Sequence, residues 1–413
     1  MSRRTWLSSR EALALLDVRP QTLYANVSRK RIRVKPDPDD PRRSLYHVGD
    51  VHRLATRGRG RPNNERVAAE SIAWGNPILA SGISTVAHGR LWYRGEDAVH
   101  LAERESLETV AALLWQSAPI PFCANTCRRV RRADALTPLD AAYDLLASRA
   151  ARDPPMYGRA LSLLQAEAAE LFTDLSDALI AAIERKTSAR RKRPGKQRAQ
   201  REPATAQLHV RLACAWRRPG AADLIRRALV LLADHELNAS TFAARVAAST
   251  GAPLSACTLA AFATLSGPLH GAAALAILGL VDAANRGGAE SAIADSLARG
   301  HRIPAFGHPL YPDGDVRALA LLGSLNPPPV FKDLWANAEH LIGEPPNVDF
   351  ALAALAVTAR LPTDAPFVLF ALARSVGWIA HALEQSQSAG LIRPRARYVG
   401  PPIPAPRPAS TST

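Results

Sequence analysis

Apolar side chains recur every three or four positions through most of this chain, a spacing that is typical of amphipathic helices. In the first sixty residues the spacing predicts a helix that begins at a Ser9 cap and a second helix that begins at Pro20. From residue 32 to residue 48, apolar and basic side chains alternate around an Asp-Pro-rich turn, which predicts a short hairpin. A third helix is predicted from about Gly49 to Ala55. The first sixty residues therefore read as a unit of their own.

The longer remainder of the chain has a different composition. Residues 71–400 are rich in Ala and Leu and predict one helix after another, with only brief strand-like stretches such as GRLWYRG. A Gly-, Arg- and Pro-rich linker at 59–70 separates this region from the first unit. Residues 185–201 carry nine basic and no acidic side chains, and their mutual repulsion predicts a disordered loop. The Pro- and Ser/Thr-rich residues 401–413 predict a disordered tail.

The overall charge of the 413-residue chain is strongly positive, with a formal net charge of +15 and a pI near 10.4. Such a charge favours polyanionic partners, either nucleic acid or phosphate-bearing ligands. No uninterrupted apolar run reaches the roughly 18 to 20 residues of a membrane span, and no secretory signal opens the chain, so we expect a cytoplasmic protein without membrane contact. Cys123 and Cys127 have no second pair nearby, and we expect no metal site.

The layout of residues 1–58 resembles the small winged helix-turn-helix of MerR and excisionase proteins, and this resemblance implies contact with DNA. The alternative interpretation is a helical appendage with a solvated basic face. In the first case the second helix presents polar side chains to a groove, and basic side chains around the hairpin lie near phosphates. The residues concerned are Gln21, Thr22, Asn26 and Arg29 on the helix, and Arg31, Arg33, Lys35, Arg42 and Arg43 around the hairpin.

Four polar stretches stand out in the Ala- and Leu-rich region. They are DHELNAST with His235, SGPLHGAAA with His270, FGHPLYPDGDVRA with His308, and EPPNVDF with Asp349. Taken singly, each histidine is typical of a structural residue near an apolar helix, and Asp349 is typical of a helix cap. In DHELNAST, either Asn238 or Ser240 is placed to cap the helix that follows.

Taken together, these residues indicate a specific chemistry. Three histidines and an aspartate lie at helix starts or tight loops of one region. A neutral imidazole at a helix start donates a hydrogen bond to a developing oxyanion, because the helix dipole disfavours its cationic form. A carboxylate beside it removes a proton next to a carbonyl group. These parts are the ones needed to make an enol.

The ordered motifs HELNAST, GPLHG, FGH with DVRA, NVDF, ARSVGWIAH and RPRARYVGP resemble those of citrate synthases. The resemblance spans about residues 71–400 and implies a mainly α-helical, two-domain subunit that works as a homodimer. It also implies a large subdomain at about 71–270 and 363–400 and a small subdomain at about 271–362. The implied reaction joins oxaloacetate to the acyl group of acetyl-CoA or another short acyl-CoA and then hydrolyses citryl-CoA. Acetyl-CoA is a co-substrate, and no permanently bound cofactor is implied.

The resemblance assigns a role to each matching residue. His270 would hydrogen-bond the thioester carbonyl while Asp349 takes the proton of the acyl methyl group, and His308 would polarise and protonate the ketone of oxaloacetate. Charged and polar side chains would hold the dicarboxylate, one of them reaching across the dimer. The substrate-binding set is His235, Arg317, Arg374 and, from across the interface, Arg393.

Some neighbouring positions depart from the family pattern. Ala272 and Ala274 stand where relatives commonly have glycine and asparagine, and Pro309 stands where they often have arginine. The acyl group is therefore open, and propionyl-CoA (as in a 2-methylcitrate synthase) and citryl-CoA cleavage remain alternatives. Two further hypotheses are a helix-turn-helix regulator whose citrate synthase-like domain senses metabolites, and a paralogue that only dimerises with a complete synthase.

Overall fold

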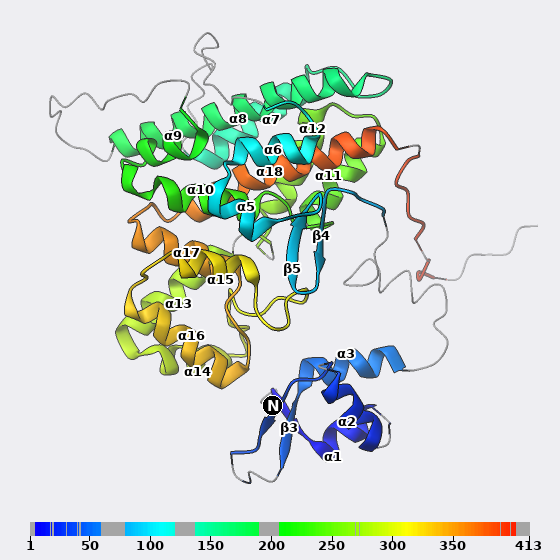
Figure 1. The fold of residues 1–413 in the computed structure, drawn as a ribbon, viewed down its shortest axis with the longest axis vertical. Coiled ribbons are helices and arrows are strands. Elements are labelled where there is room, and N and C mark those ends of the chain that lie inside the picture. Colours follow the sequence, from blue (N-terminus) through cyan, green and yellow to red (C-terminus); the bar gives the residue numbers. More distant parts are fainter. Residues whose placement is uncertain are drawn as a thin grey trace, which may run out of the picture.

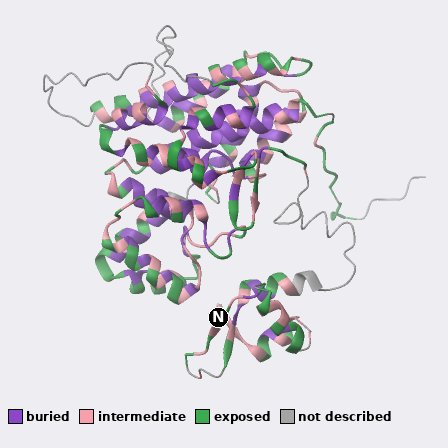
Figure 2. Ribbon diagram, viewed as in Figure 1, coloured by how far each residue is buried: buried purple, intermediate pink, exposed green. Residues whose placement is uncertain are grey.

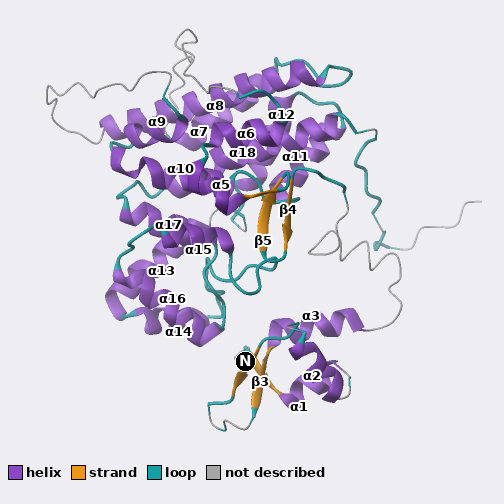
Figure 3. Cartoon of the chain, in the orientation of Figure 1, coloured by secondary structure: helices purple, strands orange, loops and turns teal. Residues whose placement is uncertain are grey.

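The chain folds into a mainly helical protein in which two small sheets lie among the helices (Figure 3). The computed structural model describes residues 5–16, 18, 20–29, 31–38, 40, 43–58, 79–119, 137–189, 206–268, 270–271, 273–388, 390–396 and 398–401. Several predictions fall outside these residues, namely the linker at 59–70, the loop from residue 190 onward, nearly all of the tail, Arg42, Cys123, Cys127 and Ala272.

The amino-terminal module has its own sheet, with the strand order β1-β3-β2, and its own apolar core (Figure 1). Leu23 of the second helix and Tyr46 of the hairpin are buried in this core. The helices and the hairpin lie where the apolar pattern predicts them, and one strand before the first helix was not predicted. The elements are β1 (Trp6–Ser8), α1 (Ser9–Leu16), α2 (Pro20–Ser28), β2 (Val34–Pro36), β3 (Ser44–His47) and α3 (Val48–Gly58).

The predicted cap of the first helix is wrong by one residue. Ser8 accepts a hydrogen bond from the Glu11 backbone N–H at 3.3 Å, and the Glu11 carboxylate accepts the Ser8 N–H at 2.8 Å. This reciprocal pair satisfies two backbone donors at the helix start, which Ser9 inside the helix does not do.

A larger helical body follows, built around the long helix α18 (Ala365–Ser386). This helix is apolar and long enough to cross a membrane, but nearly all of it is buried against α6, α8, α10, α11 and α12, so it is a core helix (Figure 2). The elements around it are β4 (Ser84–Ala87), β5 (Arg90–Tyr93), β6 (Glu96–Asp97), α5 (Ala98–Arg104), α6 (Leu107–Trp115), α7 (Pro138–Ala150), α8 (Leu161–Ala189), α9 (Leu208–Ala215), η1 (Pro219–Ala221), α10 (Ala222–Leu232), α11 (Ala239–Ser249) and α12 (Leu254–Leu265).

A second helical group packs beneath this body and contains five helices that follow one another in the chain (Figure 1). Within the group α13 packs on α14, α16 and α17, and α15 packs on α17. Contacts of α15 with α5 and α10, and of α17 with α18, join the group to the body. The helices are α13 (Ala273–Gly287), α14 (Ala289–Ala298), α15 (Val316–Gly323), α16 (Pro329–Ile342) and α17 (Val348–Thr358).

The start of the predicted disordered loop at 185–201 is helical instead. Helix α8 continues to Ala189, and its Lys186 forms an ion pair with Asp364 at 2.7 Å just before α18. The carboxylate of Asp364 therefore stabilises the first basic residues as the last turn of α8. The local sequence does not reveal this partner, because Asp364 is far away in the chain.

Candidate active site

His270 is held in a tight turn between α12 and α13. Its backbone N–H donates to Gly267 O at 3.0 Å, and the Gly271 N–H donates back to Leu265 O at 2.9 Å. A Cβ at position 271 would lie 2.5 Å from that carbonyl oxygen, so only glycine fits there. The turn places His270 directly before the first turn of α13, as the sequence predicts.

The ring of His270 contacts a buried serine on α11. Ser240 Oγ lies 2.9 Å from His270 Nε2, 2.8 Å from Asn238 Oδ1 and 3.1 Å from the indole N–H of Trp378. Asn238, not Ser240, caps α11, since its side chain accepts the Thr241 N–H. Ser240 is thus available to His270. The indole can only donate and the Asn238 Oδ1 can only accept, so the Ser240 hydroxyl donates to Asn238 in the structure and reaches His270 Nε2 as a donor only if it turns.

The imidazole of His270 is neutral at physiological pH. Burial lowers its pKa to about 4, and the nearby guanidinium of Arg374 adds to the effect. A neutral ring has one N–H, so when Ser240 donates to Nε2 the ring carries its proton on Nδ1. That arrangement makes His270 a hydrogen-bond donor on the side away from Ser240.

His235 and His308 lie together in a cluster of rings with Tyr311. The two imidazoles cross edge to face with centroids 5.0 Å apart, and the Tyr311 hydroxyl lies 3.1 Å from His235 Nε2. Burial, together with the positive charge of Arg317, lowers the pKa of His308 to about 4, although Asp315 opposes the shift. The pKa of His235 is also lowered well below its ordinary value, chiefly by burial. Both rings are therefore neutral at pH 7.

The loop that carries His308 is hydrogen-bonded to the start of α17. Gly307 N–H donates to Pro345 O at 2.7 Å, Asn347 N–H donates to Ala305 O at 3.0 Å, and the Asn347 side chain donates to Gly307 O at 3.2 Å. These bonds hold His308 close to the first turn of α17, although some forty residues separate them in the sequence.

Asp349 stands at the second position of α17 and is not the cap of that helix. Asn347 fills this role, because its side chain accepts the Asp349 N–H at 3.0 Å. The carboxylate of Asp349 is therefore not consumed by the helix start. Burial raises its pKa to about 6, although the positive charge of Arg317 opposes the rise. A carboxylate with a pKa this close to neutrality suits a general base.

Two buried guanidiniums complete the cluster. Arg317 is 2% exposed and pairs with Asp315, whose two oxygens accept Nε at 2.9 Å and Nη2 at 2.8 Å. Burial alone would lower the pKa of Arg317, but the charge of Asp315 outweighs it and raises this pKa. Asp315 also accepts the Val348 N–H at 3.1 Å, which links Arg317 to the start of α17.

Arg374, on α18, is 1% exposed and less completely paired. Its Nε donates to Leu232 O at 2.8 Å, while its Nη2 is buried and has no hydrogen-bond partner among the described residues. Burial lowers the pKa of Arg374 to about 10, Asp234 opposes the shift, and Arg317 adds to it. A buried cation with an unpaired N–H group, close to a second buried cation, is suited to bind an anion that enters the site.

Arg393 does not join this cluster within its own chain. It is exposed in the segment after α18, where the neighbouring Ile392 N–H donates to Ser249 Oγ at 3.1 Å. Ser249 ends α11, whereas Ser240 lies at its start, so about 14 Å of helix separates the Arg393 segment from the residue that contacts His270.

The structure thus brings together six of the seven predicted site residues, and their individual roles stay predictions. It also adds residues that the sequence analysis did not assign to the site. Ser240 was considered only as a cap, and Tyr311 and Asp315 were not singled out. The spacing of Asp315 two residues before Arg317 was a usable signal, because an Asp cap at a helix start lies within reach of an arginine in the first turn.

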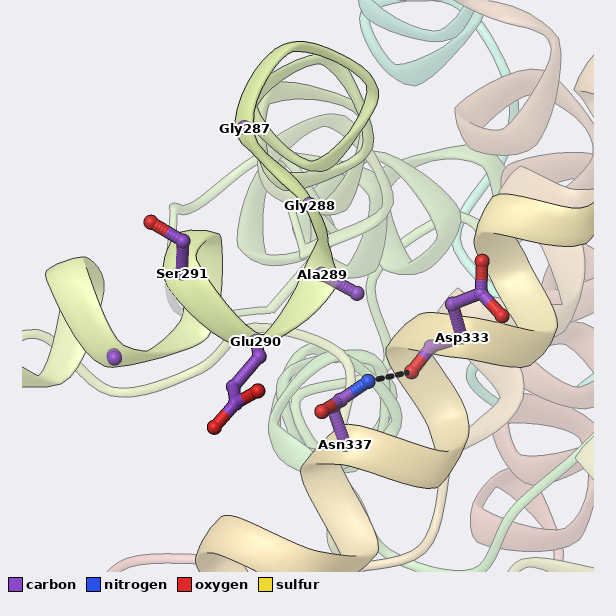
Figure 4. A pocket seen from close by; sticks show the side chains of 8 residues that line it. Gly287, Gly288, Ala289, Glu290, Ser291, Asp333 and Asn337 are labelled. Atoms are coloured by element: carbon purple, nitrogen blue, oxygen red, sulfur yellow. Dashed lines mark hydrogen bonds between the residues drawn. The ribbon is translucent and has the colours of Figure 1, made fainter.

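The described part of the chain also has a surface hollow, which lies elsewhere. It is formed by the turn between α13 and α14 and by Asp333 and Asn337 of α16 (Figure 4). The Asn337 side-chain amide donates to the backbone oxygen of Asp333 at 2.8 Å (Figure 4). None of the histidine cluster lines this space, and among the described residues no group of three or more His, Cys, Asp or Glu side chains is arranged to hold a metal ion.

A family model described as the C-terminal domain of citrate synthase matches residues 72–395. The chain belongs to the citrate synthase family. It is 41% identical over 192 residues to a citrate synthase of Haloferax volcanii, a match that covers 43% of this chain and 50% of that protein. Citrate synthase 2 of Bacillus subtilis is 37% identical over 190 residues, a match that covers 43% of this chain and 51% of that protein. The chain thus aligns with about half the length of the curated relatives it matches.

Solved structures agree with this assignment. A citrate synthase from Thermotoga maritima superposes with a TM-score of 0.64 at 25% identity, covering 82% of this chain and 98% of that one. The citrate synthase of Thermoplasma acidophilum, solved in a ternary complex with carboxymethyl coenzyme A and oxaloacetate, superposes with a TM-score of 0.66 at 25% identity, covering 81% of this chain and 96% of that one. The predicted mainly α citrate synthase fold is confirmed. The amino-terminal module lies outside the matched residues 72–395.

Proposed function

We propose that this family member condenses an acyl-CoA with oxaloacetate and hydrolyses the product, as a citrate synthase does. The observation that carries the proposal is the buried Nη2 of Arg374, which has no hydrogen-bond partner among the described residues and lies close to Arg317. The same cluster holds two neutral histidines, His270 and His308, and the carboxylate of Asp349, whose pKa is raised. Two buried cations suit a dicarboxylate, and the remaining groups suit proton transfer at a carbonyl compound.

The first step is enol formation at the acyl group. The Asp349 carboxylate removes a proton from the carbon next to the thioester carbonyl, and the neutral His270 donates its Nδ1–H to the carbonyl oxygen. Hydrogen bonding to the forming oxyanion lowers the barrier by an amount on the order of 3 kcal/mol. The Nδ1–H tautomer requires that the Ser240 hydroxyl turn from Asn238 Oδ1, to which it donates in the structure, and donate to His270 Nε2 instead.

The second step joins the two substrates. The enol carbon attacks the ketone carbon of oxaloacetate, and His308 donates a hydrogen bond and then a proton to the ketone oxygen. Water next attacks the thioester carbonyl of the condensed product and returns a proton to His308. The carbon–sulfur bond then breaks, and the proton held by Asp349 passes to the sulfur, so CoA leaves as a thiol. No step needs a resident cofactor, because the carbonyl groups of the substrates supply the reactive centres.

We propose that His235, Arg317 and Arg374 bind oxaloacetate and that Arg393 does so in a second copy of the chain. The exposed position of Arg393, away from its own cluster, is what a contribution across a homodimer requires. We also propose the division into a large subdomain, about 71–270 with 363–400, and a small one, about 271–362. His270 then stands at the boundary, and closure of the two brings His270 and Asp349 onto the same substrate.

Release of free thiol from acetyl-CoA tests the proposal. We expect the purified full chain to release thiol only when oxaloacetate is present, because the enol has no electrophile without it. Parallel reactions with acetyl-CoA and propionyl-CoA distinguish a citrate synthase from a 2-methylcitrate synthase. A relative from Shewanella oneidensis that is named 2-methylcitrate synthase is 35% identical to this chain over 184 residues. Failure to release thiol from either acyl-CoA would overturn the proposal.

We propose, as a second function, that the amino-terminal module is a winged helix-turn-helix that contacts DNA. The supporting observation is that Gln21 and Thr22 of the second helix, and Arg29 directly after its end, are exposed, while Leu23 of this helix is buried in the module's core. Two of the side chains that were expected to contact DNA form contacts within the protein. Asn26 donates its side-chain amide to Thr22 O at 2.9 Å, and Arg33, expected near phosphates, pairs with Asp50 and Glu344 instead.

Gel retardation of a DNA duplex by the full chain tests this second proposal. We expect binding to weaken steeply with salt, and the Arg29→Ala variant to reduce the slope of log K against log salt by about one. The matched control is Arg10→Ala, which removes the same charge from an exposed site on α1. Equal slopes for both variants and the parent chain would contradict a phosphate contact at Arg29.

A further inference from the structure

We propose that the amino-terminal module docks on the corner between α16 and α17. Through this contact, Arg33 acts as a positioning residue for the loops that carry His308 and Asp349. The corner consists of Gly343 and Glu344. The catalytic part of this inference rests on the proposed function, whereas the docking part stands on contacts alone.

The contact joins residues that are three hundred positions apart in the chain. Arg33 Nη1 donates to Gly343 O at 3.1 Å, and Arg33 Nη2 donates to Glu344 Oε1 at 3.3 Å. His47 Nε2 lies 3.6 Å from the same carboxylate oxygen. The guanidinium thus makes two directed hydrogen bonds to the corner, a geometry that Lys cannot reproduce.

An aromatic side chain of the module packs on the same corner. Gly343 ends α16 in the left-handed conformation, with φ of 66°, and a Cβ there would lie 2.8 Å from Trp6 Cζ2. The absence of a side chain at position 343 therefore lets the indole approach the backbone. Trp6 is in turn held by an edge-to-face contact with His47, with ring centroids 5.2 Å apart.

The module presents Arg33 in a prearranged orientation. Asp50, which is buried, accepts hydrogen bonds from the Arg33 backbone N–H at 3.0 Å and from Nε at 2.9 Å. With its backbone and Nε bound to Asp50, the side chain directs Nη1 to Gly343 O, while Nη2 lies between the module and the corner, 3.0 Å from His47 Nδ1 and 3.3 Å from both Asp50 Oδ1 and Glu344 Oε1. Little rotamer freedom is then left to lose when the contact with Glu344 forms.

Glu344 carries the contact to the catalytic loops. A Cβ on Gly307, which has φ of 72°, would lie 2.3 Å from Glu344 Oε2, so the carboxylate rests against the backbone just before His308. The residue after Glu344, Pro345, accepts the Gly307 N–H, and Asn347 caps the helix that carries Asp349. A shift of Glu344 therefore displaces both loops, and small displacements of reacting groups cost large factors in rate.

Hydrogen exchange of the full chain tests the docking without reference to activity. We expect the peptides that contain the Gly307 and Asn347 amides to exchange at least threefold faster in Arg33→Met than in the parent chain. Glu344→Ala should give the same result and leaves the Arg33–Asp50 pair intact, which separates lost docking from an unfolded module. The control is Arg10→Met, an exposed arginine of α1. Unchanged exchange in both Arg33→Met and Glu344→Ala would overturn the docking.

Thiol-release kinetics then test the positioning role. We expect Arg33→Met and Glu344→Ala to lower kcat about tenfold, with the KM for oxaloacetate changed less than twofold, because Asp315 and Leu232 still hold Arg317 and Arg374. Arg33→Lys should restore part of kcat. If exchange responds but kcat does not, the positioning role is wrong. If the parent chain releases no thiol, the proposed function fails while the exchange result still decides the docking.

Discussion

Replacement of Asp349 by Asn is expected to lower kcat for thiol release about a thousandfold. Asn has nearly the shape of Asp but cannot accept the proton of the acyl group, and a positioned general base contributes typically 10² to 10⁴ in rate. Asn347 still caps α17 in this variant, so the helix start is preserved. The matched control is Asp313→Asn, an exposed carboxylate in the loop between His308 and α15. An Asp349→Asn variant with more than a tenth of the parent kcat would contradict the assigned base.

The dependence of kcat on pH follows from the same group. Burial raises the pKa of Asp349 to about 6, so the carboxylate is protonated and inactive below that pH and ionised above it. The pKa values of His270 and His308, near 4, keep both rings neutral over the same range. We therefore expect kcat to rise tenfold per pH unit up to about pH 6 and then level off. A flat profile between pH 4.5 and pH 7 would contradict a base of raised pKa.

The Asp349→Asn variant should also be more stable than the parent above pH 6. The folded protein binds a proton at Asp349 more tightly than the unfolded chain does, so the ionised carboxylate costs stability once the pH exceeds the folded pKa. We expect a gain in the free energy of unfolding of about 3 kcal/mol at pH 8, which shrinks as the pH falls below 6 and is small at pH 4, where the folded state is protonated and the unfolded state about half protonated. Urea unfolding at the two pH values measures this difference.

The second large effect is expected at Asp315, whose replacement by Asn should reduce the free energy of unfolding by about 3 to 5 kcal/mol. Asn removes the negative charge and leaves the Arg317 guanidinium, 2% exposed, without its bidentate partner. An uncompensated charge in the interior is costly because little water reaches it. The Asn side chain can still accept the Arg317 N–H at the start of α15, so the loss measures the ion pair more than the cap.

Urea unfolding of Asp315→Asn beside Asp313→Asn measures this effect. Asp313 is exposed two residues earlier in the same loop, and its replacement should change the free energy of unfolding by less than about 0.5 kcal/mol. Equal stability of the two variants would show that Arg317 does not depend on Asp315. The KM for oxaloacetate should also rise in Asp315→Asn, because Arg317 is no longer held in its orientation.

Much of the site could be predicted because its residues stand at local chain features. The Gly-Pro break before His270, the Gly and Pro residues around His308 and the Pro-Pro pair before Asp349 each mark a turn or a helix start, where backbone groups and side chains are exposed to a site. The apolar spacing predicted the helices between these points. Helix ends were less predictable, and α8 ran into the basic stretch because Lys186 meets Asp364 from another element.

The partners of these residues could not be predicted in the same way. Ser240 looks like a cap in DHELNAST, and only the approach of α12 and α18 to α11 turns it toward His270 and Trp378. Arg33 looks like a phosphate contact in a basic hairpin, and only the position of the corner at Gly343 and Glu344 engages it elsewhere. Both assignments depend on pairs of residues far apart in the chain.

The sequence by itself determined the helical class, the family and the residue types that perform the chemistry, because apolar period, turn residues and ordered motifs are local properties of the chain. The tertiary structure alone decided which of those residues are neutral, paired or unpaired. Burial and neighbouring charge set the pKa of Asp349, His270 and His308, and both quantities arise only when distant segments pack against one another.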